Sequence, residues 1–183
     1  QQEGMKPTSV TRKLAAIRSF FQYLLRERQL KADPSETIDS LKTPQRLPKV
    51  LSEREMVRLL EQPGAATPAN LRDKAMLELM YATGVRVSEL VSLKVGDINM
   101  DMGYIRCFGK GSKERLVPIT EVALSWLEKY QKDVRDAQVL RSGQFTDVIF
   151  LNNHGHQLTR QAVWQKIKKY CQLIGITKNV TPH

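Results

Sequence analysis

Residues 71–90 read LRDKAMLELMYATGVRVSEL, and their pattern indicates a helix, a glycine corner and a second helix. The apolar positions of the first part recur at helical spacing: Leu71, Ala75, Met76, Leu79 and Met80. A helix is therefore predicted from about Ala69 to Thr83. Gly84 is the residue type that commonly ends a helix, and a short helix is predicted to follow from Val87 to Leu93.

The corner places a cation beside a helix start. Arg86 comes directly before the predicted second helix, where free backbone amides favour an anion. Glu89 follows three residues later, so on a helix its carboxylate can brace the guanidinium of Arg86. Taken alone, the pair is better explained as a plain surface ion pair.

Upstream of the corner, local signals predict two units joined by a linker. Ser52 and Glu55 form a capping box that opens a helix ending near Pro63. Before it, residues 44–52 contain Pro44 and Pro48, which indicates a stiff linker between residues 1–43 and residues 53–183.

In the first unit, the spacing predicts an amphipathic helix over Thr8–Leu30, whose apolar face needs partner helices from upstream or from another chain. A second short helix is expected over Asp33–Ser40, with Asp33 as its cap and Pro34 at its first position.

Downstream of the corner, the period changes to that of strands. Gly103–Phe108 and Glu114–Ile119 predict a β-hairpin whose glycine-flanked tip exposes Lys110. Taken alone, that tip is an ordinary turn with a solvated lysine. Three further elements are expected: a helix capped by Thr120, a short strand over Val148–Leu151, and a last helix capped by Thr159 and ended by Gly175. Their inward positions are Ala123, Leu127, Tyr130 and Val134 in the first helix, and Val163, Trp164, Ile167, Tyr170 and Cys171 in the last.

Charge points to a polyanionic partner. The 183 residues carry 29 Lys and Arg against 19 Asp and Glu, a net charge of +10. No acid follows Asp147, whereas Arg160, Lys166, Lys168, Lys169 and Lys178 do. A basic surface of this kind favours phosphate binding because it releases condensed counterions.

Other classes of protein are not indicated by the sequence. No apolar run approaches the roughly 20 residues that span a bilayer, and no glycine-rich nucleotide-binding loop is present. Cys107 and Cys171 lie far apart, which favours reduced, buried thiols over a disulfide. His154 and His156 lack neighbouring ligands, so neither a metal nor a cofactor is expected.

Together these segments resemble the tyrosine site-specific recombinase (phage integrase) family, most closely the XerD group of the bacterial Xer recombinases. The resemblance covers nearly the whole chain and rests on four motifs: residues 71–90, Pro44–Lys49, the Gly109–Arg115 hairpin and Thr159-Arg160-Gln161. It implies a mainly α fold with a small antiparallel hairpin or sheet. In this fold, the last helices of a helical core-binding DNA domain precede a catalytic domain that is incomplete at its C-terminal end.

The resemblance also implies the chemistry. Recombinases of this family cleave DNA through a 3′-phosphotyrosine and rejoin it without metal or nucleotide. Arg86 matches the first catalytic arginine and Glu89 the acid that supports it. Lys110 matches the lysine that protonates the departing 5′-oxygen, and His183 matches the start of the His-x-x-Arg motif. The second arginine and the nucleophilic tyrosine would lie beyond His183, so this piece is expected to bind DNA without cutting it.

Candidate DNA contacts are cations and polar side chains of these motifs and of the predicted helix over Thr8–Leu30. Most are expected to hold phosphates, whereas Thr159, Arg160 and Gln161 at a helix start are the expected base readers. The full set is Arg12, Arg18, Gln45, Arg46, Lys113, Arg115, Thr159, Arg160 and Gln161.

The Xer likeness further implies a role in chromosome-dimer resolution in the cytoplasm, without a membrane partner. The expected partners are double-stranded DNA carrying a short specific site, a sister recombinase of the XerC type in a heterotetramer, and a regulatory DNA translocase. Two alternatives stay open: a phage or transposon integrase with the same chemistry, and an accessory DNA-binding protein without catalysis.

Overall fold

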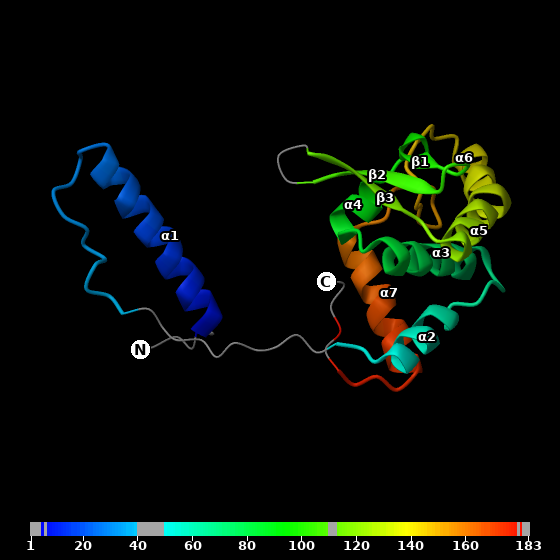
Figure 1. The fold of residues 1–183 in the computed structure, drawn as a ribbon, viewed down its shortest axis with the longest axis horizontal. Coiled ribbons are helices and arrows are strands. Elements are labelled where there is room, and N and C mark those ends of the chain that lie inside the picture. The colour runs from blue at the N-terminus through cyan, green and yellow to red at the C-terminus, as the bar shows by residue number, and fades with distance from the viewer. Residues whose placement is uncertain (1–4, 6, 40–49, 110–112, 179, 181–183) are drawn as a thin grey trace. The chain divides into compact units, whose positions relative to one another are not determined.

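The computed structural model describes residues 5, 7–39, 50–109, 113–178 and 180 (Figure 1). The chain divides into two compact units, residues 1–48 and residues 49–183, and each is described by itself. The predicted linker falls mostly on residues 44–49, which lie outside the described part, as do Ser40, Gln45 and Arg46.

The first unit contains helix α1, Pro7–Arg26. The helix is confirmed, but it ends before the predicted Leu30 because Arg28 adopts a left-handed conformation (φ 54°). No residue of α1 is buried, and Ile17 on the apolar face is 47% exposed. The apolar face is thus not covered within the described part of this unit.

The expected short helix after Asp33 is wrong over residues 33–39, which form turns. The Asp33 carboxylate accepts hydrogen bonds from the Ser35 backbone N–H (2.8 Å) and the Ser35 hydroxyl (2.6 Å). An aspartate that bonds two residues ahead stabilises a local turn instead of capping a helix.

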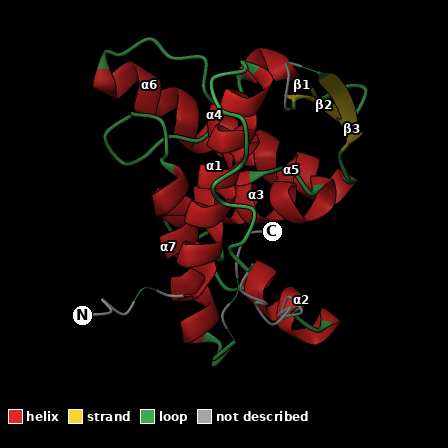
Figure 2. Cartoon of the chain, turned by 90° about the vertical axis from the view of Figure 1, so that its left-hand side faces the viewer, coloured by secondary structure: helices red, strands yellow, loops and turns green. Residues whose placement is uncertain are grey.

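The second unit is mainly helical with a small antiparallel sheet, as the sequence predicts (Figure 2). Its α-helices are α2 Glu53–Glu61, α3 Pro68–Thr83, α4 Val87–Ser92, α5 Glu121–Tyr130, α6 Asp136–Ser142 and α7 Arg160–Leu173. A 3-10 turn covers Val95–Asp97 and a π-turn covers Gln131–Arg135. The strands are β1 Ile98–Asn99, β2 Tyr104–Phe108 and β3 Glu114–Pro118, in the order β1-β2-β3.

The helix starts follow the predicted capping residues. The Glu55 carboxylate accepts from the Ser52 backbone N–H at 2.7 Å, which completes the capping box of α2. Thr120 caps α5 by accepting from the Ala123 N–H, and Thr159 caps α7 by accepting from the Ala162 N–H. Each cap satisfies a backbone donor that the first helical turn leaves unpaired.

The middle of helix α3, residues 71–79, is buried on all sides, not on one face as the sequence predicts. It lies between α2 and the layer formed by α5 and the sheet (Figure 1). Residues 71–79 are all buried, including the charged residues Arg72, Asp73, Lys74 and Glu78. These charges tolerate burial because they are paired: Arg72 with Asp73 at 2.8 Å, and Lys74 with Glu78 at 2.7 Å.

The hairpin is confirmed, and the sheet has one more strand than predicted. Along β2, Ile105 and Cys107 are buried while Arg106 and Phe108 are exposed, the alternation of a half-buried strand. The Gly109 N–H donates to the Lys113 carbonyl at 2.8 Å beside the tip. The tip itself, residues 110–112, lies outside the described residues. The missed strand β1 is two residues long and pairs Ile98 with Ile105.

Between α5 and α7, two expectations need correction. The helix predicted after Thr120 is interrupted by the π-turn before it continues as α6, although Ala123, Leu127, Tyr130 and Val134 are buried as expected. The strand predicted over Val148–Leu151 is wrong: only isolated bridges occur, Lys94 with Val148 and Leu151 with Gln157. Residues 149–151 are buried. Their backbone N–H groups donate outside any strand, the Ile149 N–H to the Leu93 carbonyl and the Leu151 N–H to the Tyr130 hydroxyl.

Helix α7 packs its apolar side chains into the core of the second unit. Val163, Ile167, Tyr170 and Cys171 are buried as predicted, whereas Trp164 is only partly buried. The helix ends before Gly175, whose φ is 75°. Cys107 and Cys171 are free and buried, as expected.

Gly84 ends α3 in the left-handed region, with φ 59°. Gly84→Ala is expected to lower the free energy of unfolding by about 1 kcal/mol, because a side chain disfavours that conformation. No atom lies within 4 Å of an added Cβ, so steric clash contributes nothing. Urea denaturation measures the change. Gly96→Ala is the matched control, because it has equally open surroundings without a positive φ. Equal effects of the two substitutions would contradict the backbone explanation.

Candidate functional site

The α3–α4 corner presents Arg86 to solvent. Arg86 is the N-cap residue of α4, and Glu89 occupies the third helical position. The Arg86 backbone N–H donates to Glu89 Oε2 at 2.8 Å, and Arg86 Nη1 donates to Glu89 Oε1 at 3.0 Å. The side chain of Arg86 is nevertheless 63% exposed. Within the described part of the chain, its Nε and Nη2 have no hydrogen-bond partner and can receive an anion.

A second arginine, Arg115 of β3, binds the same carboxylate. Its Nη1 lies 2.8 Å from Glu89 Oε1 and its Nη2 lies 2.7 Å from Glu89 Oε2, a bidentate pair. The side chain of Glu89 is only 8% exposed. The hydrogen bond from Arg115 is the largest of the effects that lower the pKa of Glu89 to about 2, against the opposing effect of burial. The same bond raises the pKa of Arg115.

The sequence placed Arg115 among the DNA contacts and did not predict its pairing with Glu89. The two residues lie 26 positions apart, on a strand and a helix, so no local spacing links them. The sequence signal for Arg115 was its position beside Lys113, directly after the predicted hairpin tip.

Lys110 and His183 lie outside the described residues. The structure does bring Arg86 and Glu89 together with β3, the strand that follows the Lys110 tip. The family matches of Arg86, Lys110 and His183 imply that the three side chains converge on one phosphate, and this convergence therefore stays a prediction.

The start of α7 exposes Thr159, Arg160 and Gln161. The Thr159 hydroxyl accepts from the Ala162 N–H at 3.1 Å, so it serves as the helix cap. Arg160 and Gln161 have no hydrogen-bond partner in the part of the chain that the structure describes. The first turn of α7 contains no acid, so its N-terminus is free of competing negative charge.

The remaining candidates differ in their surroundings. Lys113 and Arg12 are exposed. Arg18 is partly buried and donates from Nη2 to the Ile38 carbonyl within the first unit.

The stretch after Asp147 contains no acid, but two of its lysines form ion pairs with acids from earlier in the chain. It therefore carries less unpaired positive charge than the sequence indicates. Lys166 pairs with Asp73 at 2.9 Å, and Lys178 pairs with Glu55 at 2.7 Å. Asp73 also accepts from the Tyr170 hydroxyl at 2.8 Å. The sequence missed this buried network because its members are far apart in the chain.

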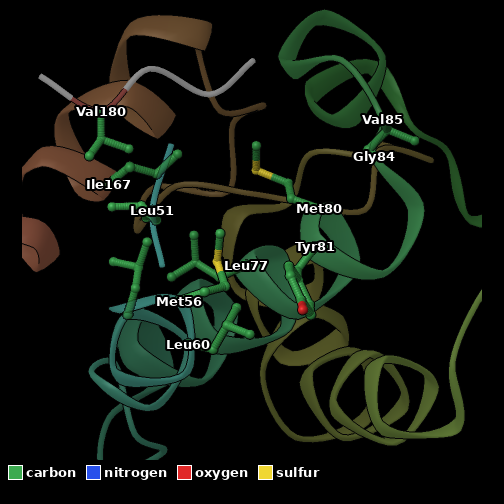
Figure 3. Close-up of a pocket in the computed structure, with 11 residues that line it drawn as sticks. Leu51, Met56, Leu60, Leu77, Met80, Tyr81, Gly84, Val85, Ile167 and Val180 are labelled. Atoms are coloured by element: carbon green, nitrogen blue, oxygen red, sulfur yellow. The ribbon is translucent and has the colours of Figure 1, made fainter. Parts of the chain in front are cut away.

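An apolar pocket of about 260 Å³ lies between α2, α3 and α7 (Figure 3). It is lined by Leu51, Met56, Leu59, Leu60, Leu77, Met80, Tyr81, Gly84, Val85, Ile167 and Val180. No charged residue lines it, so it is unsuited to holding a phosphate. Among the described residues, no three His, Cys, Asp or Glu side chains are grouped to hold a metal, and no helix is long and apolar enough to cross a membrane.

Comparison with known proteins gives consistent matches. The model of the phage integrase family matches residues 49–183. The chain is 48% identical over 181 residues to tyrosine recombinase XerD of Yersinia pestis, covering 98% of this chain and 60% of the relative. It is 45% identical over 183 residues to tyrosine recombinase XerD of Listeria monocytogenes, covering 100% of this chain and 61% of the relative.

Solved structures share the fold. XerH recombinase bound to a palindromic difH substrate, a post-cleavage complex, matches with a TM-score of 0.75 at 20% identity, covering 97% of this chain and 51% of that one. XerA recombinase matches with a TM-score of 0.62 at 27% identity, covering 97% of this chain and 58% of that one. The chain thus spans about 60% of the length of the curated relatives it matches.

Proposed function

Because the chain belongs to the phage integrase family of tyrosine recombinases, we propose that it binds a specific DNA site and supplies Arg86, Glu89, Lys110 and His183 to strand cleavage. One observation carries the proposal: Arg86 is exposed, with one edge of its guanidinium free and the other held by a buried carboxylate. A fork-shaped cation held in this way can meet two oxygens of a phosphate.

The proposed reaction is a phosphoryl transfer. A tyrosine hydroxyl attacks the DNA phosphorus and releases its proton to solvent, a Tyr–O–P bond forms, and the bond from phosphorus to the 5′-oxygen breaks. Charge gathers on the two non-bridging oxygens, which face the free Nε and Nη2 of Arg86. Lys110 gives the proton that the departing 5′-oxygen needs, an effect worth about 10²- to 10⁴-fold in rate. His183 adds a donor to the phosphate.

We propose that this chain is part of a longer recombinase and that the nucleophilic tyrosine lies in a segment matching the part of the relatives that this chain does not cover. Two of the tyrosines within it are buried and bonded: Tyr130 to the Ile149 carbonyl, and Tyr170 to Asp73. Burial is the main effect that raises the pKa of both hydroxyls, which disfavours a phenolate. Tyr23 lies on α1 and Tyr104 on β2. Tyr81 lines the apolar pocket, which contains no charged residue.

A trapping experiment tests this proposal. The target site is first selected from a random duplex library with the longer protein that contains this chain, and a nick is then placed beside the scissile phosphate. The longer protein is expected to form a covalent protein–DNA adduct, whereas residues 1–183 bind the site and form none. No adduct from the longer protein would refute the enzymatic function and favour an accessory DNA-binding role. An adduct from residues 1–183 would refute the assignment of the tyrosine.

The biological setting is proposed from the XerD relatives. The chain would act in chromosome-dimer resolution, in the cytoplasm, with a XerC-type sister recombinase in a heterotetramer under control of a DNA translocase. The alternative is a phage or transposon integrase with the same chemistry. A selected site that requires a second, different recombinase for exchange would support the first role, and exchange by one protein alone would support the second.

DNA binding by residues 1–183 is expected to be strongly salt-dependent. If about six phosphates are contacted, affinity should fall about 10³-fold between 50 and 200 mM salt. Fluorescence anisotropy with a labelled duplex measures the slope of log affinity against log salt. Lys113→Gln is expected to reduce the slope by about 1. Lys132→Gln, which removes an exposed lysine outside the candidate set, should leave it unchanged. A flat titration would contradict a phosphate-dominated interface.

A further inference from the structure

Glu89 is shared equally between two arginines. Its Oε1 accepts from Arg86 Nη1 at 3.0 Å and from Arg115 Nη1 at 2.8 Å. Its Oε2 accepts from the Arg86 backbone N–H at 2.8 Å and from Arg115 Nη2 at 2.7 Å. Each carboxylate oxygen thus joins the α4 corner to strand β3.

This sharing has an electrostatic consequence for Arg86. A carboxylate paired with Arg86 alone would cancel its charge and weaken its attraction for a phosphate. Arg115 supplies a second cation to the same carboxylate, so the trio of Arg86, Glu89 and Arg115 keeps one net positive charge. Of the two arginines, Arg86 is the more exposed, at 63% of its side chain against 37% for Arg115. The remaining charge is therefore presented mainly through Arg86.

Arg115 is also placed beside the backbone that leads into the hairpin tip. A Cβ added at Gly109 would lie 3.6 Å from Arg115 Nη1, so the glycine backbone runs past the guanidinium. In the β2–β3 register, Arg115 pairs with Cys107, and Cys107 is buried. The side chain of Arg115 therefore starts from the inner face of the hairpin and reaches α4.

We propose that Arg115 is a positioning residue for strand cleavage. It fixes Glu89, and through Glu89 it sets the orientation and net charge of Arg86 at the phosphate, while tying β3 to the α4 corner. The inference rests on the proposed function. It replaces the expectation that Arg115 contacts DNA, because both of its terminal nitrogens are bound to Glu89.

The test compares Arg115→Gln with Arg106→Gln in the longer recombinase. Arg106 is a matched control: it lies on the paired strand β2, faces the other side of the sheet, and forms an ion pair with Asp97 at 3.5 Å. Arg115→Gln is expected to slow single-turnover adduct formation by about 10- to 100-fold, the effect of misplacing a reacting group. Its DNA affinity should match that of Arg106→Gln. Equal cleavage rates for the two variants, or a loss confined to affinity, would overturn the proposal.

The pH profile separates positioning from a general loss of structure. In the wild type, the pKa of Glu89 is about 2, so the carboxylate stays ionised at every pH used for cleavage. Without the hydrogen bond from Arg115, that pKa rises. Cleavage by Arg115→Gln should therefore fall as the pH is lowered, starting at a higher pH than in the wild type or in Arg106→Gln. If the cleavage rate of Arg115→Gln falls at the same low pH as that of the wild type, Arg115 does not act through Glu89.

A double-mutant cycle with Glu89→Gln gives an independent readout. If Arg115 acts through Glu89, the double variant should cleave about as slowly as the slower single variant, because the second change has nothing left to remove. If the rate losses of the two single variants multiply in the double variant, the proposal is overturned. If Arg115→Gln fails to fold, Arg115→Lys carries the same comparisons, with a smaller rate loss expected.

The failure of this inference differs from the failure of the proposed function. A wild-type protein that forms no adduct refutes the function. A wild-type protein that forms adducts normally, with Arg115→Gln behaving like Arg106→Gln, refutes only the role of Arg115.

Discussion

Asp73→Ala is expected to lower the free energy of unfolding of the chain by about 3–5 kcal/mol. Asp73 is 2% exposed and accepts from Arg72 Nε at 2.9 Å, Lys166 Nζ at 2.9 Å and the Tyr170 hydroxyl at 2.8 Å. Its loss leaves the charge of Arg72, which is 3% exposed, without a carboxylate; among the described residues only the Leu151 carbonyl at 3.0 Å and Asn153 Oδ1 at 3.2 Å still accept from it. Urea denaturation followed by circular dichroism measures the change.

The matched control for this prediction is Asp101→Ala, which removes an exposed aspartate that has no ion pair among the described residues. Its effect should stay within about 0.5 kcal/mol. Tyr170→Phe removes only one hydrogen bond from Asp73 and should cost about 1 kcal/mol. A loss below about 1 kcal/mol for Asp73→Ala would mean that the Leu151 carbonyl and Asn153 satisfy Arg72 without a carboxylate, and it would contradict the prediction.

Arg86→Ala in the longer recombinase is expected to slow adduct formation by about 10³-fold or more, with little change in DNA affinity. The guanidinium stabilises charge that develops in the transition state, so its loss affects the rate more than binding. Arg86→Lys keeps the charge but lacks the planar fork, and should recover only part of the rate. Adduct yield on the nicked trapping duplex measures the effect.

The control for Arg86 is Arg54→Ala, which removes an exposed arginine of α2 outside the candidate site. It should cleave at the wild-type rate. Normal adduct formation by Arg86→Ala would refute the catalytic role, and an equal loss of affinity would reduce Arg86 to a DNA contact.

The sequence predicts best the features that depend on local hydrogen bonds. The capping box of Ser52 and Glu55, the glycine corner at Gly84, and the pairing of Arg86 with Glu89 each involve residues no more than four apart. Their geometry follows from helical spacing alone. The resemblance to tyrosine recombinases then supplied the family, which the comparisons confirm.

The features that the sequence missed depend on residues distant in the chain. The burial of all residues 71–79 requires knowledge of every element around α3. The pairing of Arg115 with Glu89 and of Lys166 with Asp73 joins elements that only the tertiary fold brings together. Strand β1 is too short to show a period, and the turn after Asp33 reflects competition between a side chain and the helical backbone.

The most direct measurement is a crystal structure of the longer recombinase bound to its selected DNA site. The central claim predicts that the Arg86 guanidinium, the Lys110 ammonium and the His183 imidazole all lie within hydrogen-bond distance, about 2.7–3.2 Å, of oxygens on one phosphate. Glu89 should hold Arg86 from the far side, as it does without DNA. Contacts from these three residues to different phosphates, or an Arg86 turned away from the backbone, would contradict the account.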